Sequence, residues 1–145
     1  MSLFAERIAE FSPCRKYRYW LEIVWDPETS RLGWLLLNPS TADEINDDPT
    51  LRKCQGFARQ LGYGGVIVCN VYGLRSTDPA GLWKVDDPTG SDNEYWLEQL
   101  RYRAARIVGG WGRNARAADA EWTLGVVPHV DCLRFNQDRS PMHPL

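Results

Sequence analysis

Residues 48–71 read DPTLRKCQGFARQLGYGGVIVCNV, and they decide the fold class because a helix pattern runs directly into a strand pattern. Asp48 and Pro49 are typical of a helix N-cap and of a first helical residue. Apolar side chains then recur at helical spacing until Gly62. Residues 66–71 form an apolar run with the length of a buried strand. We therefore predict a helix that begins after Asp48 and ends at Gly62, followed by a strand.

Similar patterns lie on both sides of this stretch. Upstream, residues 17–25 alternate, residues 26–30 form a turn, and residues 32–37 are apolar almost throughout. This arrangement predicts a β-hairpin whose second strand is covered on both faces. Downstream, the pattern predicts a helix after Asp92, a strand over 107–110, a helix over 115–124 and a strand over 130–135.

Strands that alternate with helices predict a single α/β domain over residues 1–145. The expected architecture has three layers: a mostly parallel sheet, helices on both of its faces, and an antiparallel N-terminal hairpin strand. The length of 145 residues, the 43% hydrophobic and the 25% charged content are those of one ordinary globular domain.

Charge and hydropathy narrow the classes of partner. The formal net charge is −2, so the molecule has no cationic field that attracts a phosphate backbone, and duplex DNA is not an expected partner. The arginines of residues 101–116 are expected on a solvated helix face. There is no apolar run of membrane length and no secretory signal pattern, which predicts a cytoplasmic protein without a membrane partner. The oligomeric state does not follow from these features.

Neither a metal nor another cofactor is expected. Cys14, Cys54, Cys69 and Cys132 are scattered without a Cys-x-x-Cys pair, which favours free and mostly buried thiols over a zinc site. Residues 110–115 loosely match the dinucleotide pattern G-x-G-x-x-A. However, no acidic residue ends the next strand, so this match does not predict a nicotinamide or flavin site.

Polar or glycine-rich residues follow every expected parallel strand. These runs begin at Asn38, at Asn70, at Gly109 and at Asn136, and the tail adds His143. Because the carboxyl ends of parallel strands meet at one edge, we expect a single ligand cleft there. Its predicted lining consists of Asn38, Ser40, Asn70, Arg75 and His143.

Three further residues are candidates for this cleft. Asp43 is expected nearby, either as a turn cap or as a carboxylate that orients Arg75. Tyr72 or Trp111 is expected to stack on a ligand, although Trp111 also fits a role in capping the core. Pro141 and Pro144 restrict the backbone around His143, so we predict that the tail folds back over the sheet edge.

The runs LLLNPSTADEINDDPTLRKC, GYGGVIVCNVYGLRSTDPAGL, GGWG and SPMHPL resemble a bacterial and phage family, domain of unknown function family 1643, over about residues 15–145. More distantly, the order Asn-Pro-Ser, Asn with a basic loop, and His-Pro is similar to that of the uracil-DNA glycosylase superfamily. That resemblance implies that Asn38 orients a water and that His143 hydrogen-bonds the departing base. It also implies that Asn70, with Tyr72 or Trp111, holds the base.

Three functions remain open. The first is hydrolysis of an N-glycosidic bond, with a free nucleoside or nucleotide, or a modified base on single-stranded DNA, as the expected substrate. The second is a non-catalytic module that binds a small nucleotide-like ligand at the same edge. The third is a protein-interaction module that uses exposed tryptophans and tyrosines.

Overall fold

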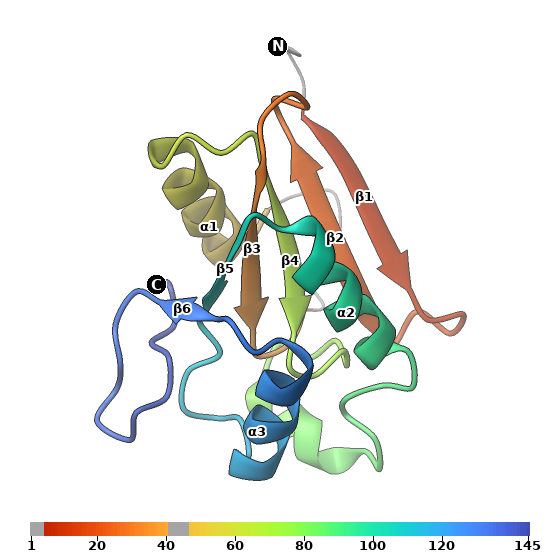
Figure 1. The fold of residues 1–145 in the computed structure, drawn as a ribbon. Helices are drawn as coiled ribbons and strands as arrows, with labels where there is room; N and C mark the ends of the chain where they lie inside the picture. Colours follow the sequence, from red (N-terminus) through yellow and green to blue (C-terminus); the bar gives the residue numbers. More distant parts are fainter. Residues whose placement is uncertain (1–4, 41–46) are drawn as a thin grey trace.

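The computed structural model describes residues 5–40 and 47–145. Within them, six strands form one mixed sheet in the order β1-β2-β4-β3-β5-β6 (Figure 1). The neighbours β3, β4, β5 and β6 are parallel, whereas β1 and β2 are antiparallel to their neighbours. The elements are β1 (Glu6–Phe11), β2 (Arg18–Val24), β3 (Arg31–Leu36), α1 (Pro49–Gln60), β4 (Gly65–Asn70), the 3₁₀ helix η1 (Pro79–Lys84), α2 (Asn93–Arg103), β5 (Arg106–Gly109), α3 (Ala117–Val126) and β6 (Asp131–Cys132).

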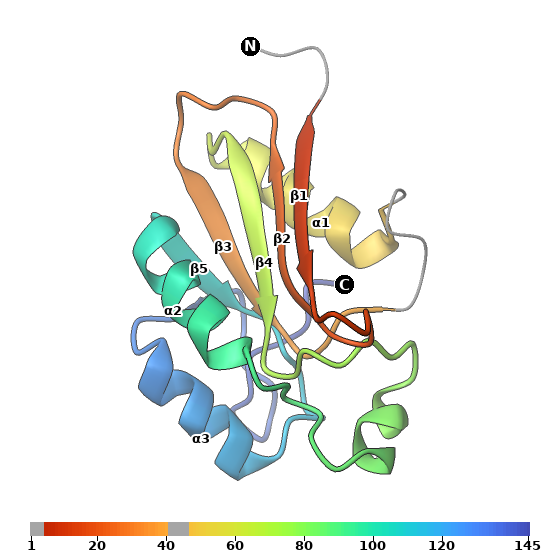
Figure 2. The ribbon, with the colours of Figure 1, turned by 90° about the vertical axis from the view of Figure 1, so that its right-hand side faces the viewer.

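Helices cover both faces of the sheet, which confirms the predicted α/β layers. Figure 2 shows α1 on one face and α2 with α3 on the other. On the α1 face, Leu51, Cys54 and Ala58 pack against the strands, as the helical spacing predicts. On the other face, Leu97 and Leu100 of α2 pack against a second cluster of buried side chains. Each face of the sheet therefore contributes its own hydrophobic core.

The predicted hairpin is wrong, because β4 lies between β2 and β3. β4 pairs antiparallel with β2 and parallel with β3. The turn over residues 26–30 wraps the start of β4, since the N–H of Gly64 donates to Ser30 O at 2.8 Å and Gly64 O accepts from Trp25. A Cβ on Gly64 would lie only 2.1 Å from Asp26 O, so this close approach requires glycine. Apolar alternation marks a strand, but it does not say which strand is its neighbour.

The edge strand β1 was not predicted. Five of its six residues are exposed, so the segment has no apolar face that sequence periodicity reveals. The other edge strand, β6, is much shorter than the predicted 130–135 and pairs only through Asp131 and Cys132. Residues 134 and 135 turn instead to the tail, where Arg134 O accepts from the N–H of Met142.

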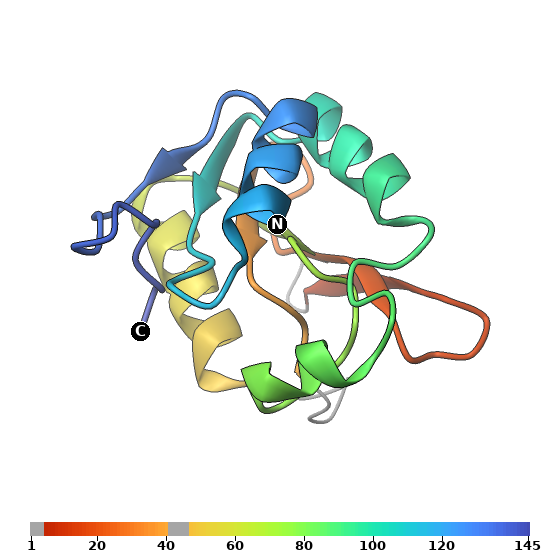
Figure 3. The same ribbon diagram turned by 90° about the horizontal axis from the view of Figure 1, so that it is seen from below.

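The connections around β3 create a crevice at the carboxyl edge of the sheet. The chain leaves β3 toward α1 on one face, whereas it leaves β4 and β5 toward α2 and α3 on the other. Loops that part in this way at neighbouring strand ends leave room for a ligand between them. Figure 3 looks onto this end of the molecule, where the C-terminal tail lies beside α1. Among the described helices, none has both the length and the apolar composition needed to cross a membrane.

Candidate functional site

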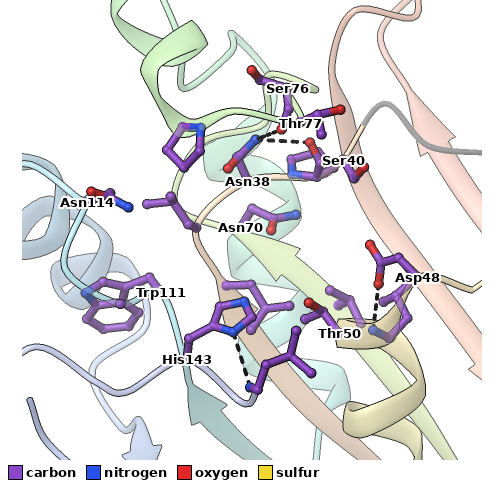
Figure 4. A pocket seen from close by; sticks show the side chains of 18 of the residues that line it. Asn38, Ser40, Asp48, Thr50, Asn70, Ser76, Thr77, Trp111, Asn114 and His143 are labelled. Carbon is purple, nitrogen blue, oxygen red and sulfur yellow. Dashed lines mark hydrogen bonds between the residues drawn. The ribbon is translucent and has the colours of Figure 1, made fainter.

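A pocket of about 590 Å³ occupies this crevice, a volume typical of small-molecule sites. Its walls come from the loops after β3, β4 and β5, the first turn of α1, and the tail (Figure 4). Five of the proposed site residues line it: Asn38, Ser40, Asn70, Trp111 and His143. The polar lining that we did not select from the sequence is Arg18, Asp48, Thr50, Ser76, Thr77, Arg113, Asn114 and Asn136.

Asn38 joins two of the loops and leaves one polar atom for the pocket. Its Nδ2 donates to Ser76 O at 2.7 Å and to Pro39 O at 3.0 Å. The N–H of Ser76 in turn donates to Pro39 O at 2.9 Å. These carbonyl acceptors fix the orientation of the amide, because only its NH₂ group can donate to them. The Oδ1 atom therefore faces away from these carbonyls, and no described residue donates to it, so it can accept a hydrogen bond from a ligand or a water (Figure 4).

Asn70 presents a buried amide to the pocket. The residue is only 2% exposed, and it continues the row of Val66 and Val68 on the α1 face of β4. Its backbone carbonyl accepts from Asn93, but its side chain makes no hydrogen bond to any residue in the described part of the chain. The polar atoms of this amide are not among the fully buried, unpartnered atoms of the described residues, so they reach the space of the pocket. The carboxamide is therefore a group that a ligand in the pocket would satisfy.

His143 lies on the tail at the mouth of the pocket. Its Nδ1 accepts from the N–H of Leu145 at 3.2 Å, so the proton of the neutral ring is assigned to Nε2. Desolvation lowers the pKa of His143, although Asp48 opposes that shift. The side chain thus favours a neutral imidazole that donates through Nε2.

The tail is held in place by the sheet edge, as the prolines predict. Pro141 O accepts from the N–H of Gly112 at 2.9 Å. Pro144 is buried against Gly110, where a Cβ would come within 3.0 Å of the proline ring. The absence of a side chain at Gly110 therefore lets the tail pack closely enough to place His143 at the pocket.

Trp111 belongs to both the core and the pocket. It is 5% exposed and packs in the hydrophobic cluster on the α2 face, while part of it lines the pocket. Both roles weighed for this residue are therefore compatible with its position. Asp43 falls outside the described residues, so its predicted role stays a prediction.

The expected role of Tyr72 in stacking on a ligand is wrong, because its side chain is fully buried away from the pocket. Its hydroxyl donates to Asp119 Oδ2 at 2.5 Å and accepts from the N–H of Arg116 at 3.1 Å. Its ring packs edge-on against Trp83. Tyr72 therefore attaches the loop after β4 to the beginning of α3.

We expect Tyr72→Phe to destabilise the protein by about 1–3 kcal/mol, because the change leaves Asp119 and the Arg116 N–H without their buried partner. Urea denaturation measures this loss. Ligand affinity should stay unchanged. A variant of normal stability with weakened ligand binding would show instead that Tyr72 acts at the site.

Arg75 also lies away from the pocket lining. Its Nη1 donates to Arg15 O at 3.1 Å, and its guanidinium lies 5.4 Å from the centre of the Phe11 ring. The basic loop after β4 therefore stabilises the β1–β2 connection. The arginines that line the pocket are instead Arg18, at the start of antiparallel β2, and Arg113, after β5.

A family model described as "Protein of unknown function (DUF1643)" matches residues 18–145. The chain belongs to this family. The match begins at Arg18 and runs through Leu145, so it includes every residue that lines the pocket but excludes β1. No curated protein sequence matches the chain significantly. These comparisons assign no activity, and they give no support to the resemblance to uracil-DNA glycosylases.

The described residues contain no group of three or more histidine, cysteine or acidic side chains placed to hold a metal ion. Cys54 and Cys69 are buried free thiols, as predicted, and burial raises the pKa of both. Cys14 is exposed and Cys132 is half-buried. At the glycine-rich entrance to α3, the Arg116 N–H is already bonded to Tyr72, and the Asp119 carboxylate lies beside it. That helix start is therefore poorly suited to a dinucleotide phosphate.

Proposed function

We propose that the pocket binds a nucleobase-type heterocycle and that the protein hydrolyses the N-glycosidic bond of a nucleoside-like substrate. The observation that carries the proposal is the buried carboxamide of Asn70, which faces the pocket without a hydrogen-bond partner among the described residues. An amide offers a donor and an acceptor side by side. The edges of nucleobases offer the complementary pair.

Much of the remaining lining suits a planar heterocycle. Asn114 and Asn136 add further amides, and Trp111 supplies an aromatic surface. The hydroxyls of Ser40, Thr50, Ser76 and Thr77 are neutral as well. These amides, hydroxyls and the aromatic surface suit hydrogen bonding and stacking with a heterocycle, and the charged side chains of Arg18, Asp48 and Arg113 lie on the same lining.

The chemistry assigned to the pocket needs a positioned water and a donor to the leaving base. Asn38 Oδ1 would accept a hydrogen bond from the water, because Nδ2 is committed to the loop carbonyls. The water oxygen attacks the anomeric carbon, the C–N bond breaks, and its electron pair moves onto the base. The Nε2–H of His143 stabilises the negative charge that develops there. One proton of the water passes to solvent and the base takes one up, so the products are free base and free sugar.

The test is incubation of the protein with nucleosides, nucleotides and single-stranded oligonucleotides that carry modified bases, with chromatography to detect released base. We expect release from at least one of them and loss of that release in Asn70→Leu. If none is cleaved while nucleosides raise the melting temperature, the protein is a binding module and the hydrolytic half of the proposal is wrong. If no base or nucleoside stabilises the folded protein, the binding half is wrong too.

A further inference from the structure

The residue that precedes α1 places a carboxylate in the pocket, and the hydrolysis proposed above does not use it. Asp48 is the N-cap of α1, and its Oδ1 accepts from the N–H of Leu51 at 2.8 Å. Its second oxygen is directed away from that bond on the pocket side (Figure 4), and no described residue pairs with it. The side chain of Thr50 lines the pocket beside it.

This helix start does not favour a phosphate. Pro49 has no N–H, the Leu51 N–H is bonded to the Asp48 carboxylate, and the Arg52 N–H is bonded to Asp48 O at 3.1 Å. The negative charge of Asp48 would also repel an anion placed there. The usual attraction of a helix N-terminus for phosphate is therefore reduced at α1, where only the Thr50 N–H of the first turn has no acceptor among the described residues.

A carboxylate beside a hydroxyl suits a different group. An ionised carboxylate only accepts hydrogen bonds, and it accepts them most strongly from donors such as hydroxyls. Two neighbouring hydroxyls on one sugar ring provide two such donors for the free oxygen of Asp48, and Thr50 can both donate and accept. The buried amide of Asn70, which lines the same pocket, independently indicates that a ligand with a heterocyclic edge belongs here.

We propose that the ligand is a ribonucleoside, whose 2′,3′-diol is held by Asp48 and Thr50 while its base is held by Asn70. This inference rests on the proposed binding of a nucleobase and adds the identity of the sugar. Compounds without the 2′-hydroxyl leave a pocket carboxylate without its donor. The site therefore selects ribonucleosides over 2′-deoxynucleosides.

The test is isothermal titration with adenosine, guanosine, cytidine and uridine, each beside its free base, its 2′-deoxy counterpart and its 5′-monophosphate. We expect the best ribonucleoside to bind about tenfold or more tightly than its 2′-deoxy counterpart, since a site built to bind a hydroxyl discriminates against the analogue that lacks it. In Asp48→Asn, which keeps a good N-cap acceptor, the ratio of ribonucleoside affinity to 2′-deoxynucleoside affinity should fall toward one without a loss of thermal stability. Thr50→Val is the second variant and should lower the same ratio by a smaller factor.

A ratio near one in the unmodified protein, or a ratio that survives Asp48→Asn, would overturn the inference. The two proposals fail differently. If free bases bind through Asn70 with no preference for the ribonucleoside, the sugar assignment is wrong and the base pocket remains. If neither bases nor nucleosides bind, both are wrong.

Discussion

Asn70→Leu is expected to make the protein more stable while it removes nucleoside binding. Leucine has the same branching and the same number of side-chain heavy atoms as asparagine, and its larger methyl groups can extend into the pocket. It also continues the apolar row that Val66 and Val68 form on the same face of β4. The change removes a buried amide that has no hydrogen-bond partner in the described structure, so we expect a gain of about 1 kcal/mol, or about 2–4 °C in melting temperature. Loss of two hydrogen bonds to a base edge should weaken binding by about 1–3 kcal/mol, roughly five- to a hundredfold.

Asn93→Leu is the matched control, because Asn93 is also a fully buried asparagine. Its Nδ2 donates to Asn70 O at 2.9 Å and to Val71 O at 3.1 Å. Removing it leaves two buried carbonyls without this donor, which should lower stability by about 2 kcal/mol or more. Opposite signs of the two stability changes distinguish a binding residue from a structural one. If Asn70→Leu is as destabilising as Asn93→Leu, the Asn70 amide has a structural role and the proposed site loses its main support.

His143→Ala is expected to lower nucleoside affinity about five- to a hundredfold with little change in melting temperature, since the side chain is exposed and bonds only to Leu145 within the described chain. His129, which lies beside a separate pocket near β6, provides the control variant His129→Ala. That control should bind the ligand normally. Equal affinity in both variants would show that the tail does not take part in binding.

The pH dependence of binding gives a second measure of the same residue. Desolvation lowers the pKa of His143 below its ordinary value of 6.5, so the folded state favours the neutral ring. Stability that depends on this neutral form is complete above pH 6.5 and is lost as the pH falls through the lowered pKa. Protonation at Nδ1 also opposes the donation from the Leu145 N–H. Affinity should therefore be flat above about pH 6.5 and fall below it, and His143→Ala should remove that fall.

Much of the fold follows from local patterns in the sequence. Helix α1 begins after Asp48, as its cap and proline predict, and Asp92 immediately precedes α2. Which strands pair with each other depends on contacts between distant parts of the chain, so local patterns do not predict it. The pairing of β4 with β2 depends on a turn that closes around Gly64, and nothing in the alternation of residues 17–25 encodes that contact. Strand β1 escaped prediction because it is exposed and depends on pairing with β2.

The sequence predicts at which edge of the sheet the site lies, but it predicts only some of the side chains that line it. The rule that parallel strands end together placed Asn38 and Asn70 at one pocket, and the prolines of the tail indicated that His143 joins them. It did not reveal the direction of each side chain, and Tyr72 and Arg75 turn away to bond other elements. Arg18 was missed because β2 is antiparallel and reaches this edge with its first residue. The sequence pattern identifies Asp48 as a helix cap, and it does not show that the same side chain also lines the pocket.

The most direct test of the central claim is an NMR titration that follows the side-chain NH₂ signals of Asn70 and Asn93, assigned with the two leucine variants. The titrants are the four ribonucleosides and their free bases. We expect at least one of them to shift the Asn70 signals, because the Asn70 amide donates to the ligand. The Asn93 signals should move little, because the Asn93 amide already donates to Asn70 O and Val71 O. Asn70 signals that stay in place with every titrant, in protein that remains folded, would contradict it.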